Sequence, residues 1–364
     1  MPQLPGHRTA VIASVAIAGL ALAGCGSKSS STNAGSTASS GGAKSASSYK
    51  ACMVTDTGGI DDKSFNAAAW QGMQAAQQDG KATVSYVQSK AATDYATNIK
   101  SLQAQSCNLI LTVGGLMGDA TKAAATSAPD QKFAEVDSTG NGKNLQGLQF
   151  NTAQAGFLSG YLAAGYSKSG KVATYGGLPI PPVTVYMDGF AEGVQYYNKE
   201  KGKNVQVLGW TEQSQKGSFA SSFTDQNKGQ QLAGNFIAQG ADVIFPVAGG
   251  TGLGSAAVAK STGKAVIIWV DTDGFVSASQ YAGVFLTTAE KNIAQAVQKA
   301  VEDGSAGTYA TTDYVGTLAN KGVGLADFHD FASKVDSGLK SELDQVSADI
   351  ISGKITISSK SQPK

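Results

Sequence analysis

Short apolar runs alternate with longer segments of helical spacing along most of the chain. A first series of predicted strands alternates with helices at 66–78 and 95–105; the strands are 51–54, 83–87, 109–113 and 133–136. A second series of strands follows at 171–175, 205–209, 243–247, 265–270 and 284–286, with helices at 154–166, 184–199, 229–239 and 255–261. Strands separated by helices form right-handed crossovers in a mostly parallel sheet. The pattern predicts an α/β protein with two sheets, and therefore two lobes.

The N-terminal segment has the pattern of an export signal. His7 and Arg8 precede an uncharged run at 9–23, which is shorter than the roughly 20 residues that cross a bilayer. The run ends in Leu-Ala-Gly-Cys, which resembles a lipobox whose cysteine, Cys25, becomes the lipid-carrying mature N-terminus. We therefore expect a signal peptide at 1–24; an uncleaved anchor and a plain signal peptide are the alternatives.

Residues 25–48 form a different kind of segment. They are almost entirely Ser, Gly, Ala, Thr and Asn, which are too small and polar to build a core. A flexible linker of this length spans on the order of 25 to 30 Å. The sequence predicts a lipid-anchored tether that carries a folded body from residue 49 onward.

The charge and the apolar pattern of the chain bear on two classes of partner, nucleic acids and membranes. The formal net charge is +1, and no basic stripe is present, so nothing indicates nucleic acid binding. After Gly24 no apolar run is long enough to cross a membrane, so contact with the membrane is expected through the lipid anchor only.

Two further cysteines, Cys52 and Cys107, open short apolar runs. Outside the cytoplasm such a pair is able to oxidise. If the two runs are neighbouring strands, the thiols can form a disulfide; two small buried hydrophobic side chains are an equally good interpretation.

The end of the first strand carries candidate binding residues. In open α/β sheets, ligands bind at the carboxyl ends of strands, and Asp56 lies at such an end. Gly58 and Gly59 allow a tight turn, and Ser64 is a suitable N-cap for the next helix. A capped turn does not explain Phe65, whose ring is a platform for a flat ligand; packing in the core is the alternative.

A glycine-rich segment at 248–255 follows the strand at 243–247, and the next strand ends at Asp271. A glycine-rich turn with an acid some 20 residues on is the outline of a dinucleotide site. Ser255 occupies the third glycine position, however, and nicotinamide cofactors are scarce outside the cell. Close approach of backbone to a ligand is the simpler use of these glycines.

Enzymatic constellations are missing from the sequence. The only histidines are His7 and His329, so neither a paired-histidine metal site nor a Ser-His-Asp triad with spare partners is available. No Gly-x-Ser-x-Gly elbow and no Walker lysine occur. We expect a binding protein with no catalytic residues, no metal and no cofactor.

Together these motifs resemble the basic membrane protein (BMP) family of ABC-transporter substrate-binding lipoproteins, the group similar to purine nucleoside receptor A of spirochaetes. The segments that carry the resemblance are 56–66, 223–225 with 228–229, 240–252 and 270–273, supported by 176–177, 187–190 and 350–355. The block at 240–252 is the most specific of them.

The resemblance implies a type I periplasmic-binding-protein fold, with two doubly wound parallel-sheet lobes joined by three hinge crossings. It implies an N-terminal lobe at 49–150 plus 287–308 and a C-terminal lobe at 151–286 plus 309–364.

The resemblance also implies a nucleoside site between the lobes, with a purine nucleoside as the expected ligand. Phe65 and Phe223 would enclose the base, and Asp56 and Asn66 would bind its edge. The remaining residues would hold the sugar or approach it with backbone: Asp271, Lys291, Asp119, Gly249, Gly250 and Gly252.

The function implied is capture of a nucleoside by lobe closure, on the extracytoplasmic face of the cell membrane. The partners would be an ABC permease with a cytoplasmic ATPase, and the protein would act as a monomer. A ligand-sensing or surface signalling lipoprotein of the same fold is the alternative, because fold does not determine function.

Overall fold

The computed structural model describes residues 47–363. The predicted signal peptide, Cys25 and residues 26–46 of the linker lie outside the described residues. The described chain belongs to one compact unit, Lys44–Lys364, which contains two six-stranded sheets.

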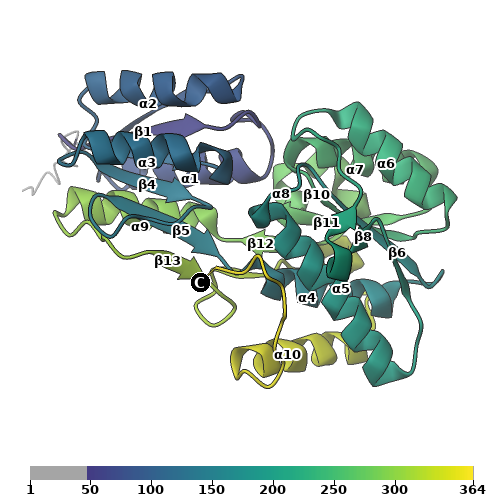
Figure 1. Ribbon diagram of the computed structural model, residues 1–364. Coiled ribbons are helices and arrows are strands. Elements are labelled where there is room, and N and C mark those ends of the chain that lie inside the picture. The colour runs from purple at the N-terminus through teal and green to yellow at the C-terminus, as the bar shows by residue number, and fades with distance from the viewer. Residues whose placement is uncertain (1–46, 364) are drawn as a thin grey trace, which may run out of the picture. The chain divides into compact units, whose positions relative to one another are not determined.

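The first sheet has the strand order β13-β5-β4-β3-β1-β2, and every neighbouring pair is parallel. Its strands are β1 (Lys50–Thr55), β2 (Thr83–Gln88), β3 (Leu109–Val113), β4 (Lys132–Val136), β5 (Leu145–Phe150) and β13 (Tyr314–Gly316). Successive side chains of a strand point to opposite faces, so Met53 and Val54 join different hydrophobic cores. These cores are covered by two packed pairs of helices, α1 (Phe65–Gln78) with α9 (Ile293–Ser305) and α2 (Tyr95–Ala104) with α3 (Gly118–Ser127) (Figure 1).

The second sheet has the order β14-β12-β11-β10-β6-β7 and is parallel except for β14. Its strands are β6 (Lys171–Gly176), β7 (Gln206–Leu208), β10 (Val243–Val247), β11 (Val266–Asp271), β12 (Phe285–Lys291) and β14 (Val323–Leu325). The longer helices that follow or cover these strands are α4 (Thr152–Tyr166), α5 (Pro181–Lys201), α6 (Gln226–Ala238), α7 (Gly252–Thr262) and α10 (Ser337–Ile351) (Figure 1). Two short elements complete this part, the hairpin β8 (Trp210–Thr211) with β9 (Lys216–Gly217) and the helix α8 (Gly274–Ser277).

The chain passes between the two sheets three times, after β5, after β12 and after β13. We call the first sheet with its helices the first lobe, and the second sheet with its helices the second lobe. The lobe boundaries expected from the resemblance need correction. Residues 287–291 pair within the second sheet because β12 continues to Lys291, and residues 314–316 pair with β5 in the first sheet.

Glycines allow α4 and α5 to approach each other closely. A Cβ atom at Gly160 would lie 2.0 Å from the carbonyl oxygen of Phe190, and one at Gly189 would lie 2.1 Å from that of Ala153. Only the absence of side chains permits such backbone contact. This packing fixes α5 against α4, and α5 also contacts β6 and β10 of the second sheet.

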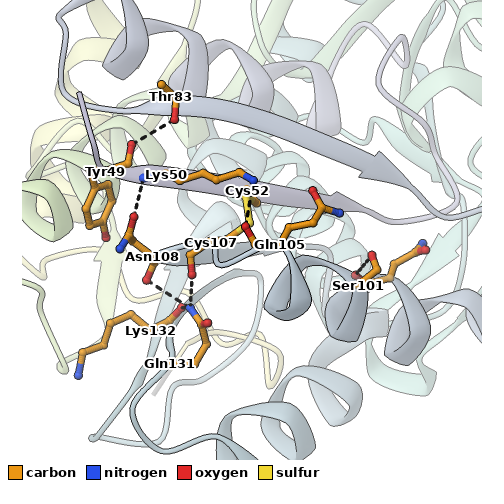
Figure 2. The surroundings of a disulfide bond; sticks show 11 residues. Tyr49, Lys50, Cys52, Thr83, Ser101, Gln105, Cys107, Asn108, Gln131 and Lys132 are labelled. Carbon is orange, nitrogen blue, oxygen red and sulfur yellow. Dashed lines mark hydrogen bonds between the residues drawn. A yellow bond between two sulfur atoms is a disulfide. The ribbon is translucent and has the colours of Figure 1, made fainter. Parts of the chain in front are cut away.

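Cys52 and Cys107 form a disulfide between β1 and the beginning of β3 (Figure 2). Their Cα atoms are 5.9 Å apart, and the bond closes a loop with a sequence separation of 55. In the chain-entropy model a loop of this size stabilises the fold by about 4 kcal/mol. Nearby, the Asn108 side chain accepts a hydrogen bond from the Lys50 amide at 2.7 Å, and the Gln131 side chain donates to the Cys107 carbonyl at 3.0 Å. The disulfide and these hydrogen bonds therefore hold the beginning of β1 against β3 and β4.

Within residues 47–363, none of the helices has the length and apolar character needed to span a bilayer.

Candidate functional site

Carboxyl ends of strands from both sheets line one cavity. The first lobe contributes the segments after β1, β3 and β4, and the second lobe contributes the segments after β6, β10 and β11. The side chains and glycines that carry the argument below are Asp56, Phe65, Asn66, Gly114, Asp137, Tyr186, Phe223, Gly249, Asp271 and Lys291. This position agrees with the general rule for ligand sites in open α/β sheets.

On the first-lobe side, three buried polar residues form a connected group. The Asn66 amide nitrogen donates to Asp56 Oδ1 at 2.8 Å and to Asp62 Oδ2 at 3.0 Å. Asp62 also accepts hydrogen bonds from the backbone amides of Ser64, Asn66 and Ala67. The side chain that caps α1 is therefore Asp62, since the hydroxyl expected to do so, that of Ser64, makes no capping bond.

Two aromatic side chains line the cavity from different lobes. Phe65 is the first residue of α1, and Phe223 precedes α6 in the second lobe. The Phe223 carbonyl accepts a hydrogen bond from the Thr251 amide at 3.0 Å, which holds that loop on the second sheet. A Cβ atom at Gly177 would lie 2.3 Å from the Phe223 ring, so this glycine makes room for the aromatic side chain.

The cavity also contains an ion pair that joins the lobes. Lys291 Nζ, at the end of β12, lies 2.6 Å from Asp137 Oδ2, and the two side chains are only 3% and 8% exposed. The same ammonium lies 4.8 Å from the centre of the Phe65 ring. Asp271 is close by and accepts a hydrogen bond on Oδ1 from the Tyr186 hydroxyl at 3.3 Å. Both aspartates have positive φ angles, 71° for Asp137 and 69° for Asp271, which are unusual for residues with side chains.

Burial dominates the electrostatics of this cavity. Burial raises the pKa of Asp56 to about 6, although hydrogen bonds from Asn66 and Gly58 oppose the shift. Burial raises the pKa of Asp271 to about 7, against the attraction of Lys291. For Asp137, burial likewise raises the pKa in spite of the ion pair with Lys291. Among the described residues that line the cavity, Lys291 is the one cation beside four carboxylates, so the arrangement suits a neutral ligand rich in donors and disfavours an anion.

Seven of the ten ligand-binding residues predicted from the sequence line this cavity, and three do not. Asp119 is exposed in the first turn of α3, because the 3₁₀ turn Gly115–Met117 carries the chain away from the cavity before that helix begins. Gly250 and Gly252 are buried, the first against Phe223 and Asp62 and the second against Trp269. Of the glycine-rich segment, Ala248 and Gly249 line the cavity.

The structure adds cavity residues that the sequence analysis missed, above all Asp137, Tyr186 and Gly114. Asp137 directly follows β4, so the rule about strand ends would have found it. No local motif marks Tyr186, which reaches the cavity only because of how α5 packs.

Potential metal ligands do not cluster in the described part of the chain. Across residues 47–363, no group of three or more His, Cys, Asp or Glu side chains is placed to hold one. The dinucleotide alternative also loses support, since Ser255 is buried and its hydroxyl donates to the Gly229 carbonyl at 3.2 Å.

Known proteins of similar sequence match nearly the whole chain. The family model for PnrA-like ABC transporter substrate-binding proteins matches residues 49–361. The ABC transporter nucleoside-binding protein BmpA of Lactococcus lactis subsp. cremoris (strain MG1363) is 30% identical, over 97% of this chain and 99% of that protein. The CD4+ T-cell-stimulating antigen of Listeria monocytogenes serovar 1/2a (strain ATCC BAA-679 / EGD-e) is 32% identical, over 94% and 95%.

Solved structures share the fold. A solute-binding protein of an ABC transporter system from Aeropyrum pernix K1 superposes with a TM-score of 0.75 at 22% identity, over 85% of this chain and 92% of that one. A second, from Conexibacter woesei DSM 14684, has a TM-score of 0.66 at 22% identity, over 85% and 99%. The predicted fold of two parallel-sheet lobes is confirmed.

Proposed function

The chain belongs to the family of PnrA-like ABC transporter substrate-binding proteins, and we propose that its ligand is a nucleoside, held between the lobes. A protein of this family is a binding protein and not an enzyme, and it delivers its ligand to a membrane permease from the extracytoplasmic side. The proposal concerns the ligand, the residues that hold it and the lipid anchor at Cys25.

The observation that carries the proposal is the combination of aromatic and carboxylate side chains in one cavity. Phe65 and Phe223 line it from opposite lobes, and two aromatic rings accept any flat base between them. Closure of the lobes around the base would remove its apolar surface from water, which is the main favourable term in such binding.

The end of the cavity near β11 and β12 suits a sugar. Asp271 uses Oδ1 to accept from Tyr186, and its other oxygen is available to a hydroxyl group. Lys291 can donate to a hydroxyl oxygen while it remains paired with Asp137. The name of the Lactococcus lactis relative, which refers to nucleoside binding, supports the same ligand class.

The pattern of the N-terminal residues supports a lipid anchor. Leu22 to Cys25 resemble a lipobox, and the Ser- and Gly-rich segment that follows is long enough to hold the body above the membrane surface. In this arrangement the tether keeps the receptor near its permease while the body moves freely.

Titration calorimetry of residues 47–364 with nucleosides, free bases and sugars tests the proposal. We expect binding of at least one nucleoside, and Phe65→Ala should weaken it by about 10- to 100-fold, since stacking on an aromatic ring contributes about 1–3 kcal/mol. Phe275→Ala is the matched control, because that ring stacks on His329 at 4.1 Å and does not line the cavity. Absence of heat with every nucleoside, or equal affinity of Phe65→Ala and the unchanged protein, would contradict the proposal.

A further inference from the structure

The Asn66 side chain has no free donor. It is only 1% exposed, and the two hydrogens of its amide group are directed to Asp56 Oδ1 at 2.8 Å and Asp62 Oδ2 at 3.0 Å. The orientation of the amide is fixed by charge, because an amide oxygen in this position would face two carboxylate oxygens and be repelled. Asn66 therefore offers a ligand only its carbonyl oxygen.

That carbonyl oxygen lacks a partner. Asn66 Oδ1 is buried and accepts no hydrogen bond from any residue in the described part of the chain. A buried acceptor without a donor destabilises a fold by about 1–3 kcal/mol. Since Asn66 lines the ligand cavity, a donor group of the ligand is the natural partner of this oxygen.

Asp56, like Asn66, offers a hydrogen-bond acceptor to a ligand. Its Oδ1 accepts hydrogen bonds from the Gly58 amide at 2.8 Å and from the Asn66 amide group. Its Oδ2 accepts none from residues 47–363. Gly114, with a φ of 121°, keeps this oxygen uncovered: a Cβ atom there would lie 2.9 Å from Asp56 Oδ2. Burial raises the pKa of Asp56 to about 6, so at pH 7.5 the group is mainly a carboxylate and accepts hydrogen bonds.

We propose that Asp56 and Asn66 present two acceptors and no donor to the base, and thereby select a base whose edge carries two adjacent N–H donors. This inference rests on the proposed nucleoside function and names the preferred ligand class within it. Among the common bases, guanine alone has this edge, formed by its ring N1–H and its exocyclic amine. Hypoxanthine lacks the amine, and adenine places an unprotonated ring nitrogen beside its amine, which would face an acceptor.

Calorimetry of residues 47–364 at pH 7.5 with guanosine, inosine and adenosine tests the preference. Guanosine should bind roughly 10- to 100-fold more tightly than either competitor, since each loses a hydrogen bond to a buried acceptor. Equal affinities, or tighter binding of inosine or adenosine, would overturn the inference and leave nucleoside binding intact. If the unchanged protein bound none of the three, the proposed function itself would fail.

Two variants distinguish selection at the base from binding in general. Asp56→Asn replaces an acceptor oxygen with a donor, so the ratio of guanosine to adenosine affinity should fall at least 10-fold. Asp271→Asn, which changes the group assigned to the sugar, should weaken all three nucleosides by the same factor and preserve their ratios. A guanosine preference that survives Asp56→Asn would overturn the role assigned to Asp56, and circular dichroism would verify that both variants are folded. The comparison of guanosine, inosine and adenosine uses the unchanged protein, so its outcome does not depend on the folding of any variant.

Discussion

Asp137 and Asp271 occupy equivalent positions in the two lobes. Asp137 directly follows β4, which is the third strand from one edge of the first sheet. Asp271 is the last residue of β11, which is the third strand from one edge of the second sheet. Each has a φ close to 70° and lines the ligand cavity. The two sheets therefore present the same residue type, in the same unusual backbone conformation, from opposite sides.

The two aspartates differ in their partners. Asp137 is paired with the Lys291 ammonium at 2.6 Å, whereas Asp271 accepts one hydrogen bond from a neutral Tyr186 hydroxyl at 3.3 Å. Because Lys291 cannot neutralise both carboxylates, the two equivalent aspartates have different roles. Asp137 serves to hold Lys291 and to join the lobes, and Asp271 is left available to a ligand.

The largest effect is expected when the pairing of Asp137 is broken. Lys291→Met leaves a buried carboxylate without its cation and should lower the free energy of unfolding by about 3–5 kcal/mol. Chemical denaturation at pH 7.5 measures this loss. In the double variant Lys291→Met with Asp137→Asn, most of the stability should return, because no uncompensated charge remains.

Lys299→Met is the control for this experiment. Lys299 pairs with Asp303 at 2.8 Å, but its side chain is 71% exposed, and an ion pair in such a position contributes about 0–1 kcal/mol. A loss in Lys291→Met no greater than that in Lys299→Met would mean that the two aspartates do not differ in the way their partners suggest.

A smaller effect, which depends on pH, is expected at Asp271. Its pKa in the folded protein is about 7, above the ordinary value of 3.8, so the folded state favours the protonated form. The stability associated with this group is present at low pH and is lost as the pH rises through 7. Asp271→Asn should therefore exceed the unchanged protein in stability by roughly 2 kcal/mol at pH 8, and by less at pH 5.

Denaturation at the two pH values, together with nucleoside calorimetry, checks this expectation. Asp188→Asn provides the contrast, since Trp210, Gln215 and Ser359 donate to both oxygens of Asp188 and an amide would turn a donor toward a donor. That variant should lose stability at both pH values. If Asp271→Asn behaved in the same way, Asp271 would be a structural residue and not a site for ligand.

The contrast between the aspartates also shows what sequence patterns can predict. The central strands are buried and mostly apolar, so hydrophobic runs predict β1, β3, β4, β10 and β11. The strand β5, which reads Leu-Gln-Gly-Leu-Gln-Phe, and the helix α10 were not predicted. The glutamines and glycine of β5 interrupt its apolar pattern, although all six residues are buried.

The candidate site was predicted where a motif coincided with a strand end, as at Asp56 and Asp271. Asp119 was predicted from the family resemblance, but backbone turns decide where such a side chain points, and a resemblance in sequence does not determine that direction. Asp137 follows a predicted strand, so its place in the cavity could have been predicted, but its pairing with Lys291, 154 residues away along the chain, could not. Charge pairing across the lobes becomes visible only when both sheets are assembled.

The smallest effect is expected from the hydroxyl group that orients Asp271. Tyr186→Phe removes the donor to Asp271 Oδ1 but keeps the ring, which packs edge-to-face on Phe245 at 5.9 Å. One neutral hydrogen bond contributes about 0.5–1.5 kcal/mol, so nucleoside affinity in calorimetry should fall by between two- and tenfold while the fold remains intact. Tyr175→Phe is the matched control, because its hydroxyl contacts Ser255 at 2.7 Å outside the cavity, and it should leave affinity unchanged. Unchanged affinity in Tyr186→Phe would mean that Asp271 is oriented by its backbone alone, and the difference between the two aspartates would then rest entirely on Lys291.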